Sequence, residues 1–389
     1  MNTIPYSCQD ISQADIDAVI AVLHAECLTQ GPVVPAFEDA AARYCGAHYA
    51  VAVNSATSAL HIACLALGVG PGDRVWTSPI TFVASANCAL YCGAMVDFVD
   101  IDPETYNLSV DRLSEKLVMA AKVDQLPKVV IPVHLSGQPC DMASIHALSL
   151  RYGFKIIEDA SHALSGKYKG EPIGCGRYSD ITIFSFHPVK IITSGEGGMA
   201  LTNNVALSTR LRLLRSHGIS STSEEMYPRP LQEIWNYQQI ALGFNYRMTD
   251  IHAALGLSQM RRLEEFVNQR HSIAKRYDEL LATLPVTTPW QHPDSYSAYH
   301  LYVIRLHLEA IGKTQRQVYE ALRTAGILVN LHYIPVYRHP YYEQMGFAAG
   351  YCPEAEEYFA QAISIPLYPS LTIVQQEYVA LTLREVLGV

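Results

Sequence analysis

Short apolar strands alternate with helical segments over the first half of the chain. Strands are expected over residues 51–53, 74–77, 95–99, 128–133 and 154–158, and helices over 62–67, 81–92, 110–122 and 142–152. This alternation is typical of βαβ units, whose strands run parallel in one sheet that helices cover on both faces. We therefore expect an α/β fold with a large, mostly parallel sheet. Ligands of such sheets gather at the carboxyl ends of the strands.

One lysine follows a further buried strand. Residues 180–186 are β-branched and aromatic, and Lys190 precedes the glycine-rich run 195–198, which allows a sharp return into a strand over 199–202. A lysine among apolar neighbours can have a lowered pKa, and its neutral amine can form a Schiff base with a carbonyl. A lone lysine in a loop is more often simply exposed. The interpretation of Lys190 therefore depends on the other motifs.

Small and hydroxyl residues follow the strand over 51–53. Ala56, Thr57 and Ser58 stand where a helix begins, and free backbone N–H groups at a helix N-terminus favour a phosphate. Ordinary helix capping by Thr57 or Ser58 explains the same pattern and is more common. The motif is a phosphate site only if other groups of one cofactor accompany it.

Asp159 comes directly after the apolar strand 154–158, with Ser161 and His162 beyond it. A carboxylate at the end of a buried strand needs a positive partner or a helix to cap. Pyridoxal phosphate needs a lysine for its aldehyde, an acid for its ring nitrogen and a helix N-terminus for its phosphate. Phe82 opens the next helix and can cover the ring, although core packing explains it equally well. The combination predicts pyridoxal 5′-phosphate as cofactor.

Four segments carry a resemblance to a known family: 54–61, 159–162, 185–198 and 243–250. They resemble the signature of the DegT/DnrJ/EryC1/StrS nucleotide-sugar aminotransferases, a fold type I group of pyridoxal phosphate enzymes, and the resemblance runs nearly end to end. Residues 5–6, 28–31, 54–60, 185–187 and 332–335 resemble the branch that acts in pseudaminic acid biosynthesis.

The resemblance implies a role for each matching residue. Lys190 would form the Schiff base and act as general base, Asp159 would pair with the pyridinium nitrogen, and His162 would lie near the ring hydroxyl. Phe82 would stack on the ring, and the phosphate would be held by Ala56, Thr57 and Ser185. Asn245 would reach the cofactor phosphate of the neighbouring subunit, which implies a homodimer with shared active sites. Substrate contacts would come from Tyr6, Glu26, Cys27, Leu28, Thr29, Leu331, His332, Tyr333 and Ile334.

The implied reaction is transfer of an amino group from L-glutamate to C4 of a UDP-4-keto-6-deoxy-N-acetyl-L-hexosamine, giving UDP-4-amino-4,6-dideoxy-N-acetyl-β-L-altrosamine. Three alternatives remain. The chain is a sibling aminotransferase for another UDP- or dTDP-keto sugar, a dehydratase of the same family, or a regulator that binds a nucleotide sugar without catalysis. Lys190 argues against the dehydratase, which has histidine there, and its combination with Asp159 and a phosphate cradle argues against the regulator.

Elements outside the βαβ series complete the expected fold. Ser12 and Asp15 form a capping box that starts a helix over 13–27. A helix over 205–216 is followed by a polar surface loop over 218–237, a lid or a subunit contact. Charged residues become denser after Arg261, so we expect a large cofactor-binding domain over 1–262 and a small α+β domain over 263–389. The small domain is expected to contain a strand over 300–306 and helices over 314–324, 353–363 and 373–387.

Composition limits the remaining possibilities. The 389 residues carry a net charge of −9, which gives no general electrostatic reason to bind nucleic acid or an anionic membrane. The nine cysteines are scattered and form no C-x-x-C pair, so we expect a reducing cytoplasm and no metal site. The first residues lack the basic and apolar regions of a signal peptide, which also favours a cytoplasmic location.

Overall fold

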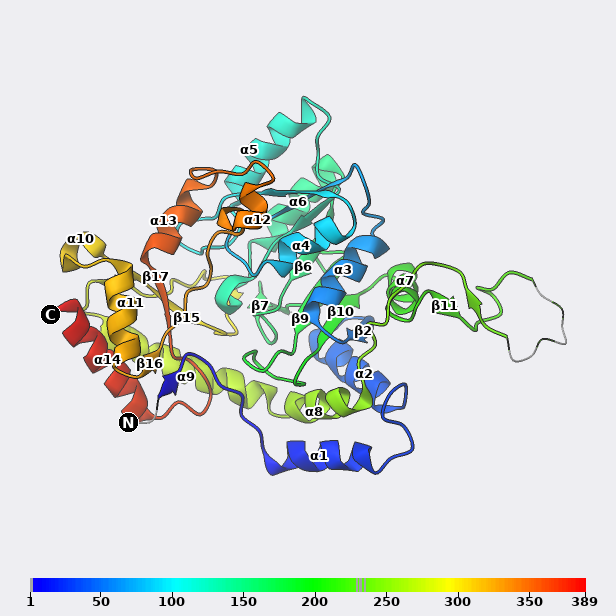
Figure 1. Ribbon diagram of the computed structural model, residues 1–389, viewed down its shortest axis with the longest axis horizontal. Coiled ribbons are helices and arrows are strands. Elements are labelled where there is room, and N and C mark those ends of the chain that lie inside the picture. The colour runs from blue at the N-terminus through cyan, green and yellow to red at the C-terminus, as the bar shows by residue number, and fades with distance from the viewer. Residues whose placement is uncertain (1–2, 229, 231–232, 234–235) are drawn as a thin grey trace.

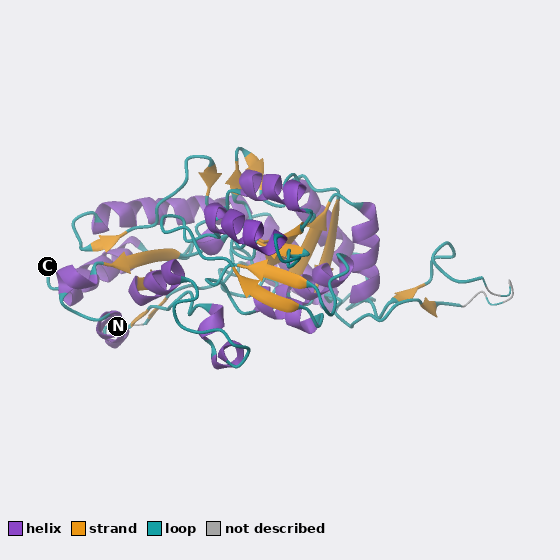
Figure 2. Cartoon of the chain, turned by 90° about the horizontal axis from the view of Figure 1, so that it is seen from above, coloured by secondary structure: helices purple, strands orange, loops and turns teal. Residues whose placement is uncertain are grey.

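A seven-stranded sheet forms the centre of the computed structural model, which describes residues 3–228, 230, 233 and 236–389 (Figures 1 and 2). Its strands lie in the order β2 (Tyr49–Val53), β10 (Gly198–Thr202), β9 (Ile181–Ser185), β6 (Lys155–Asp159), β5 (Val129–Ile131), β3 (Arg74–Thr77) and β4 (Met95–Phe98). Neighbouring strands run parallel, except that β10 is antiparallel to both β2 and β9. The expected mixed, mostly parallel sheet of an α/β fold is confirmed.

Both faces of this sheet are apolar and covered by helices. One face packs against α3 (Ala56–Ala66), α4 (Ala84–Tyr91) and α7 (Val205–Arg215). The other face packs against α2 (Val33–Cys45), α5 (Val110–Ala121) and α6 (Met142–Tyr152). Successive residues of β2 alternate between the two cores, since Val51 and Val53 belong to one and Ala50 and Ala52 to the other. Burial on both faces explains why the strands are almost continuously apolar.

Several predicted element boundaries are wrong. The capping box of Ser12 and Asp15 is confirmed, but α1 (Gln13–Leu23) ends four residues earlier than expected because the residues after it are exposed and carry no apolar repeat. Helix α3 begins at Ala56 rather than Ile62, and α4 begins at Ala84 rather than Thr81. Strand β6 includes Asp159 as its last residue.

The C-terminal part has its own core. The antiparallel strands β13 (Val286–Thr287), β15 (Tyr302–Leu306) and β17 (Ala362–Ile365) pack with α11 (Gln315–Thr324) and α14 (Ile373–Leu387). Helix α13 (Pro353–Gln361) is shorter than predicted, because Ala362 and Ile363 belong to β17. Strand β1 (Ile4–Pro5) pairs with β16 (Ile327–Leu328), so the start of the chain joins this part.

Smaller elements connect these parts. Strands β14 (Ser295–Tyr296), β7 (Lys167–Tyr168) and β8 (Glu171–Pro172) form a separate sheet, and α10 (Leu308–Ile311) and α12 (Pro340–Glu343) are single turns. Helix α8 (Asp250–Met260) leads into α9 (Leu263–Leu281), which begins at the expected domain boundary. Phe266 of α9 packs in a core of the sheet and Tyr277 in the C-terminal core, so the division into 1–262 and 263–389 stays a proposal.

The segment 218–237 was expected to be a loop. It begins with β11 (Ile219–Ser220), which pairs with β12 (Gln238–Gln239) in a ribbon that projects away from the rest of the molecule (Figures 1 and 2). Residues 229, 231–232 and 234–235 of this segment lie outside the described residues. Its role as a lid or subunit contact stays a prediction.

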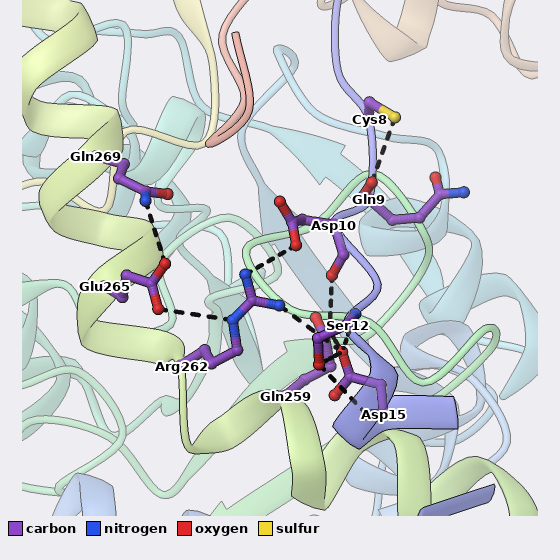
Figure 3. A network of polar contacts seen from close by, with 9 residues as sticks. All are labelled: Cys8, Gln9, Asp10, Ser12, Asp15, Gln259, Arg262, Glu265 and Gln269. Atoms are coloured by element: carbon purple, nitrogen blue, oxygen red, sulfur yellow. Dashed lines mark hydrogen bonds and ion pairs between the residues drawn. The ribbon is translucent and has the colours of Figure 1, made fainter. Parts of the chain in front are cut away.

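A polar network fixes the path of the N-terminal segment (Figure 3). The side-chain amide of Gln259 donates to the carbonyl of Asp10 at 2.9 Å and to Oδ2 of Asp15 at 2.7 Å. Arg262 donates to Oδ1 of Asp10 at 2.8 Å. These bonds tie the segment before α1 to the junction of α8 and α9. Within the described part of the chain, no helix combines the length and the apolar character that crossing a membrane requires.

Candidate active site

A cavity of about 770 Å³ opens beside the carboxyl ends of β6 and β9. Its walls are the start of α3, the turn before α4, the lysine turn, and the loop 330–334 together with Tyr6. The cavity brings together most of the predicted site residues, namely Tyr6, Ala56, Thr57, Phe82, Asp159, His162, Ser185, Lys190, Leu331, His332, Tyr333 and Ile334. Its place agrees with the rule for ligands of parallel sheets.

Lys190 lies on the turn between β9 and β10. The turn folds back on Phe186, whose carbonyl accepts from the Ser194 N–H at 3.0 Å and whose N–H donates to the carbonyl of Gly197 at 2.9 Å. A Cβ on Gly197 would lie 2.2 Å from Oγ of Ser194, so any other residue there would have to displace that side chain. Burial lowers the pKa of Lys190 to about 8, and the nearby Asp159 opposes this shift. The amine is therefore partly neutral near pH 7 to 8.

Asp159 is 5% exposed and has three hydrogen-bond donors. Oδ2 accepts from Oγ of Ser85 at 2.6 Å, and Oδ1 accepts from the N–H and the hydroxyl of Ser161 at 3.1 and 2.6 Å. The sequence did not identify Ser85 or Ser161 as site residues. The place of Ser85 one turn after Phe82 is the signal that could have found it.

The N-terminus of α3 faces the same cavity. Ser55 caps the helix by accepting from the Ser58 N–H at 3.2 Å, so the expectation that Thr57 or Ser58 is the cap is wrong. The first N–H groups of a helix have no partner within it, and Ala56 and Thr57 line the cavity. A Cβ on Gly198 would lie 2.4 Å from the Ala56 nitrogen, so glycine allows β10 to approach this helix start.

His162 is buried and neutral. Its Nδ1 accepts from the Ser136 N–H at 3.3 Å, which leaves the ring proton on Nε2, 3.2 Å from the hydroxyl of Tyr333. Burial, Lys190 and His332 hold the pKa of His162 well below its usual value. His162 can therefore donate a hydrogen bond from Nε2 without carrying a charge.

Two aromatic side chains at the cavity differ in how they are held. Phe82 is 58% exposed, so core packing does not explain it, and its ring is free to cover a flat ligand. The buried His332 contacts the ring of Tyr6 with 5.2 Å between centroids, and its Nδ1 lies 2.7 Å from Oγ of Ser364. Burial and Lys190 lower the pKa of His332 to about 3. Tyr6 and His332 thus form one fixed wall.

Some predicted residues lie outside this cavity. Asn245 is exposed, and its backbone forms an isolated antiparallel β-bridge with Ser216. The residues Glu26, Cys27, Leu28 and Thr29 are exposed in the connection between α1 and α2, where Thr29 bridges to Thr249. Within one chain, none of these five side chains lines the described cavity. Residues 26–29 are thus not beside the predicted cofactor site of their own chain, and the roles of all five residues stay predictions.

The residues of the cavity fit pyridoxal phosphate. They offer an amine with a lowered pKa at Lys190, a hydrogen-bonded carboxyl at Asp159 and a helix N-terminus at Ala56 and Thr57. The exposed ring of Phe82 adds an aromatic face. This set meets the needs of the aldehyde, the pyridine nitrogen, the phosphate and the ring.

Known proteins share this fold along its whole length. The chain is 39% identical to the spore coat polysaccharide biosynthesis protein SpsC of Bacillus subtilis, over 95% of this chain and 93% of that protein. It is 36% identical to a Campylobacter jejuni UDP-4-amino-4,6-dideoxy-N-acetyl-beta-L-altrosamine transaminase, over 99% and 97%.

Two solved structures are also similar. PseC of Helicobacter pylori, an aminotransferase involved in the biosynthesis of pseudoaminic acid, has a TM-score of 0.90 at 28% identity over 99% of both chains. The PLP form of Spr1654 of Streptococcus pneumoniae, a putative sugar aminotransferase, has a TM-score of 0.88 at 29% identity over 99% and 98%. Residues 9–384 match the DegT/DnrJ/EryC1/StrS aminotransferase family. The chain belongs to this family and is a pyridoxal-phosphate-dependent sugar aminotransferase of fold type I.

Proposed function

We propose that this aminotransferase moves the amino group of L-glutamate to C4 of a UDP-4-keto-6-deoxy-N-acetyl-L-hexosamine, giving UDP-4-amino-4,6-dideoxy-N-acetyl-β-L-altrosamine for pseudaminic acid biosynthesis. The observation that carries this proposal is the match, along almost the entire chain, to a transaminase named for that sugar. The wall formed by Tyr6 and residues 331–334 supports it, because this wall borders the same cavity as Lys190.

Lys190 has the central role in the proposed mechanism. When bound, pyridoxal phosphate supplies an aldehyde that carries the amino group and a ring that accepts electrons. The Nζ of Lys190 takes the proton from Cα of the amino donor and later delivers one to C4 of the sugar. Its pKa of about 8 suits this work, because a general base is most effective with a pKa near the working pH.

The other cavity residues bind and orient. Asp159, held by Ser85 and Ser161, would pair with the ring nitrogen, and neutral His162, whose Nε2 contacts the Tyr333 hydroxyl, would lie near the ring hydroxyl. The phosphate is assigned to Ala56, Thr57 and Ser185, and Phe82 covers the ring. The buried histidines His162 and His332 are neutral and add no positive charge near Lys190, whose lowered pKa comes from burial.

We also propose a homodimer in which each chain completes the other's site. Asn245 and residues 26–29 are exposed and lie outside the cavity of their own chain, which supports a role at the cavity of a partner. Asn245 is assigned to the partner's cofactor phosphate, and Glu26 to Thr29 to the partner's substrate. The nine free cysteines support a cytoplasmic location.

A second candidate is amination of a different UDP- or dTDP-linked keto sugar. The spore coat protein SpsC favours it, because its name points to another polysaccharide and its sequence is similar over nearly the same span. In this case the chemistry at Lys190 is unchanged and only the sugar wall differs.

Incubating the purified holoenzyme with glutamate and a panel of UDP- and dTDP-keto sugars tests the proposal. We expect turnover of the UDP-linked L-hexosamine, with 2-oxoglutarate formed in equal amount and the product identified by NMR. Turnover of a dTDP sugar or a D-series sugar alone would favour the second candidate. The variant Lys190→Ala should be inactive with every sugar and serves as the control.

A further inference from the structure

A buried arginine lies behind the active site. Arg270 of α9 is 1% exposed, and within the described part of the chain it has no carboxylate in an ion pair. Its Nη1 donates to the carbonyl oxygens of Tyr299 at 3.2 Å, His300 at 3.2 Å and Leu367 at 3.1 Å. A buried guanidinium without a carboxylate is unfavourable for folding compared with an apolar side chain. The role of Arg270 is therefore inferred from the three carbonyl groups that it binds.

The hydrogen bond from Arg270 to the carbonyl of His300 leads to His162. The N–H of His300 donates to the carbonyl of Ser136 at 2.8 Å, and the N–H of Ser136 donates to Nδ1 of His162 at 3.3 Å. The rings of His300 and His162 also lie against each other, with 4.3 Å between centroids. Arg270 is thus connected through backbone groups to the atom that sets the tautomer of His162.

The backbone at this contact is strained. Tyr299 has a φ of 46° and Ser136 a φ of 58°, both in the left-handed region that bulky residues avoid. Glycine at position 137 allows the two segments to approach closely, because a Cβ there would lie 2.9 Å from the Tyr299 nitrogen. Such conformations persist where surrounding bonds fix them. Arg270 supplies such a bond at the carbonyl of Tyr299.

The second contact leads to the sugar wall. The N–H of Leu367 donates to the carbonyl of Tyr6 at 3.0 Å, while the carbonyl of Leu367 accepts from Arg270. Arg270 and Lys190 also border the same small cavity behind the site. One guanidinium therefore contacts both the backbone that leads to His162 and the backbone that leads to Tyr6.

We propose that Arg270 is a positioning residue of the aminotransferase site, which fixes the backbone behind His162 and Tyr6. The proposal rests on the proposed role of His162 in cofactor binding.

The charges around the two histidines agree with this role. His300 faces His162, Lys190, Arg270 and His332, all of which oppose its protonation together with burial, so its pKa lies well below the usual value. His162 faces Lys190, His332, His300 and the hydroxyl of Tyr333. Removing the charge of Arg270 therefore makes protonation of His300, whose ring lies against that of His162, easier.

Three variants of the holoenzyme test the proposal. Arg270→Met removes the charge and the donors, whereas Arg270→Lys keeps a charge and three donor hydrogens on one nitrogen. All three bonds come from Nη1, and lysine is one atom shorter than arginine to that position, so Arg270→Lys keeps the charge but lengthens these bonds. Arg276→Met is the matched control, because Arg276 lies on the same helix and pairs with Glu377 at the surface.

The readouts are the cofactor absorbance of the resting enzyme, titrated from about pH 9 down to the pH at which the enzyme unfolds, and the pH profile of kcat/KM. In Arg270→Met we expect the acid transition to move up by about one pH unit and kcat to fall about tenfold. Arg270→Lys and Arg276→Met should titrate like the parent. If Arg270→Met lowers only the melting temperature and leaves the transition unmoved, the positioning role is wrong.

His162→Gln separates this proposal from the one it rests on. We expect it to remove the acid transition. If it titrates like the parent, the role of His162 fails and the positioning role of Arg270 fails with it. If it removes the transition while Arg270→Met leaves it in place, only the role of Arg270 is overturned. Should Arg270→Met be insoluble, Arg270→Gln replaces it with the same expected shift.

Discussion

Oγ of Ser85 donates a hydrogen bond of 2.6 Å to Oδ2 of Asp159. Ser85 is completely buried, and its Oγ also lies 2.8 Å from Oγ1 of Thr81. On the other side of the carboxylate, Ser161 donates to Oδ1. Ser85 of α4 and Ser161 after β6 therefore hold the two oxygens of Asp159 from opposite sides.

Replacing Ser85 tests this arrangement. Ser85→Ala removes a bond to a charged group worth about 1.5 kcal/mol, so we expect kcat to fall about tenfold in steady-state assays while the protein remains folded. Ser149→Ala is the matched control, because its hydroxyl bonds a carbonyl of its own helix α6, away from the cavity. Parent-like turnover in Ser85→Ala would show that Asp159 is held by other groups.

Gly198 tests the phosphate site. An added methyl group would meet the backbone of Ser55 and Ala56 at 2.4 to 2.6 Å and force β10 away from the start of α3. We expect Gly198→Ala to lose about 1 to 3 kcal/mol of unfolding free energy and to release cofactor during dialysis. Gly70→Ala is the control, because nothing lies within 4 Å of its added Cβ. Full cofactor retention in Gly198→Ala would argue against phosphate binding at this helix.

Mixed dimers test whether two chains share each site. Lys190→Ala and Asn245→Ala are expected to be impaired when measured separately. In a dimer of one chain of each kind, one site combines the intact Lys190 with the intact Asn245. After random mixing we expect about one quarter of the parent activity, since about half of the dimers are mixed and one site in each is complete.

Activity of the mixture that equals the average of the separate variants would contradict a shared site. Sedimentation of both variants is the control, because only stable dimers that exchange chains make the comparison valid. A monomer of Asn245→Ala with full cofactor occupancy would also contradict it.

The interaction of Lys190 with Asp159 gives a pH prediction. In the cofactor-free protein, acylation of Lys190 should have a midpoint at its pKa of about 8. The negative charge of Asp159 raises that pKa, so Asp159→Asn should move the midpoint to lower pH. Quantitative mass spectrometry of the Lys190 peptide measures both midpoints. An unmoved midpoint in Asp159→Asn would show that the two groups do not interact.

Local signals predicted much of the fold. The sheet strands are apolar on both faces, and the capping box at Ser12 is contained within four residues, so both were readable from the sequence. Helix α2 was not predicted, because Pro32 at its start has no capping side chain. The cap comes from Asp250, whose carboxylate accepts from the N–H groups of Gly31 and Val34 at 2.7 and 2.9 Å.

The residues of the candidate site likewise divide into those found from local sequence signals and those missed. Lys190, Asp159 and the start of α3 were found because each follows a strand and carries its chemistry in a few neighbouring residues. Ser85 and Arg270 were missed because their partners, Asp159 and Leu367, are distant in sequence. Asn245 and residues 26–29 do not line the cavity of their own chain, and local sequence patterns could not show this because it depends on contacts distant in sequence.

Peptide mapping of the holoenzyme after borohydride reduction tests the central claim most directly. The account predicts that the reduced cofactor is attached to Nζ of Lys190, at about one group per chain, and that Lys190→Ala carries none. Cofactor fixed to another lysine, or an unmodified Lys190 in enzyme that retains its full cofactor content, would contradict the account.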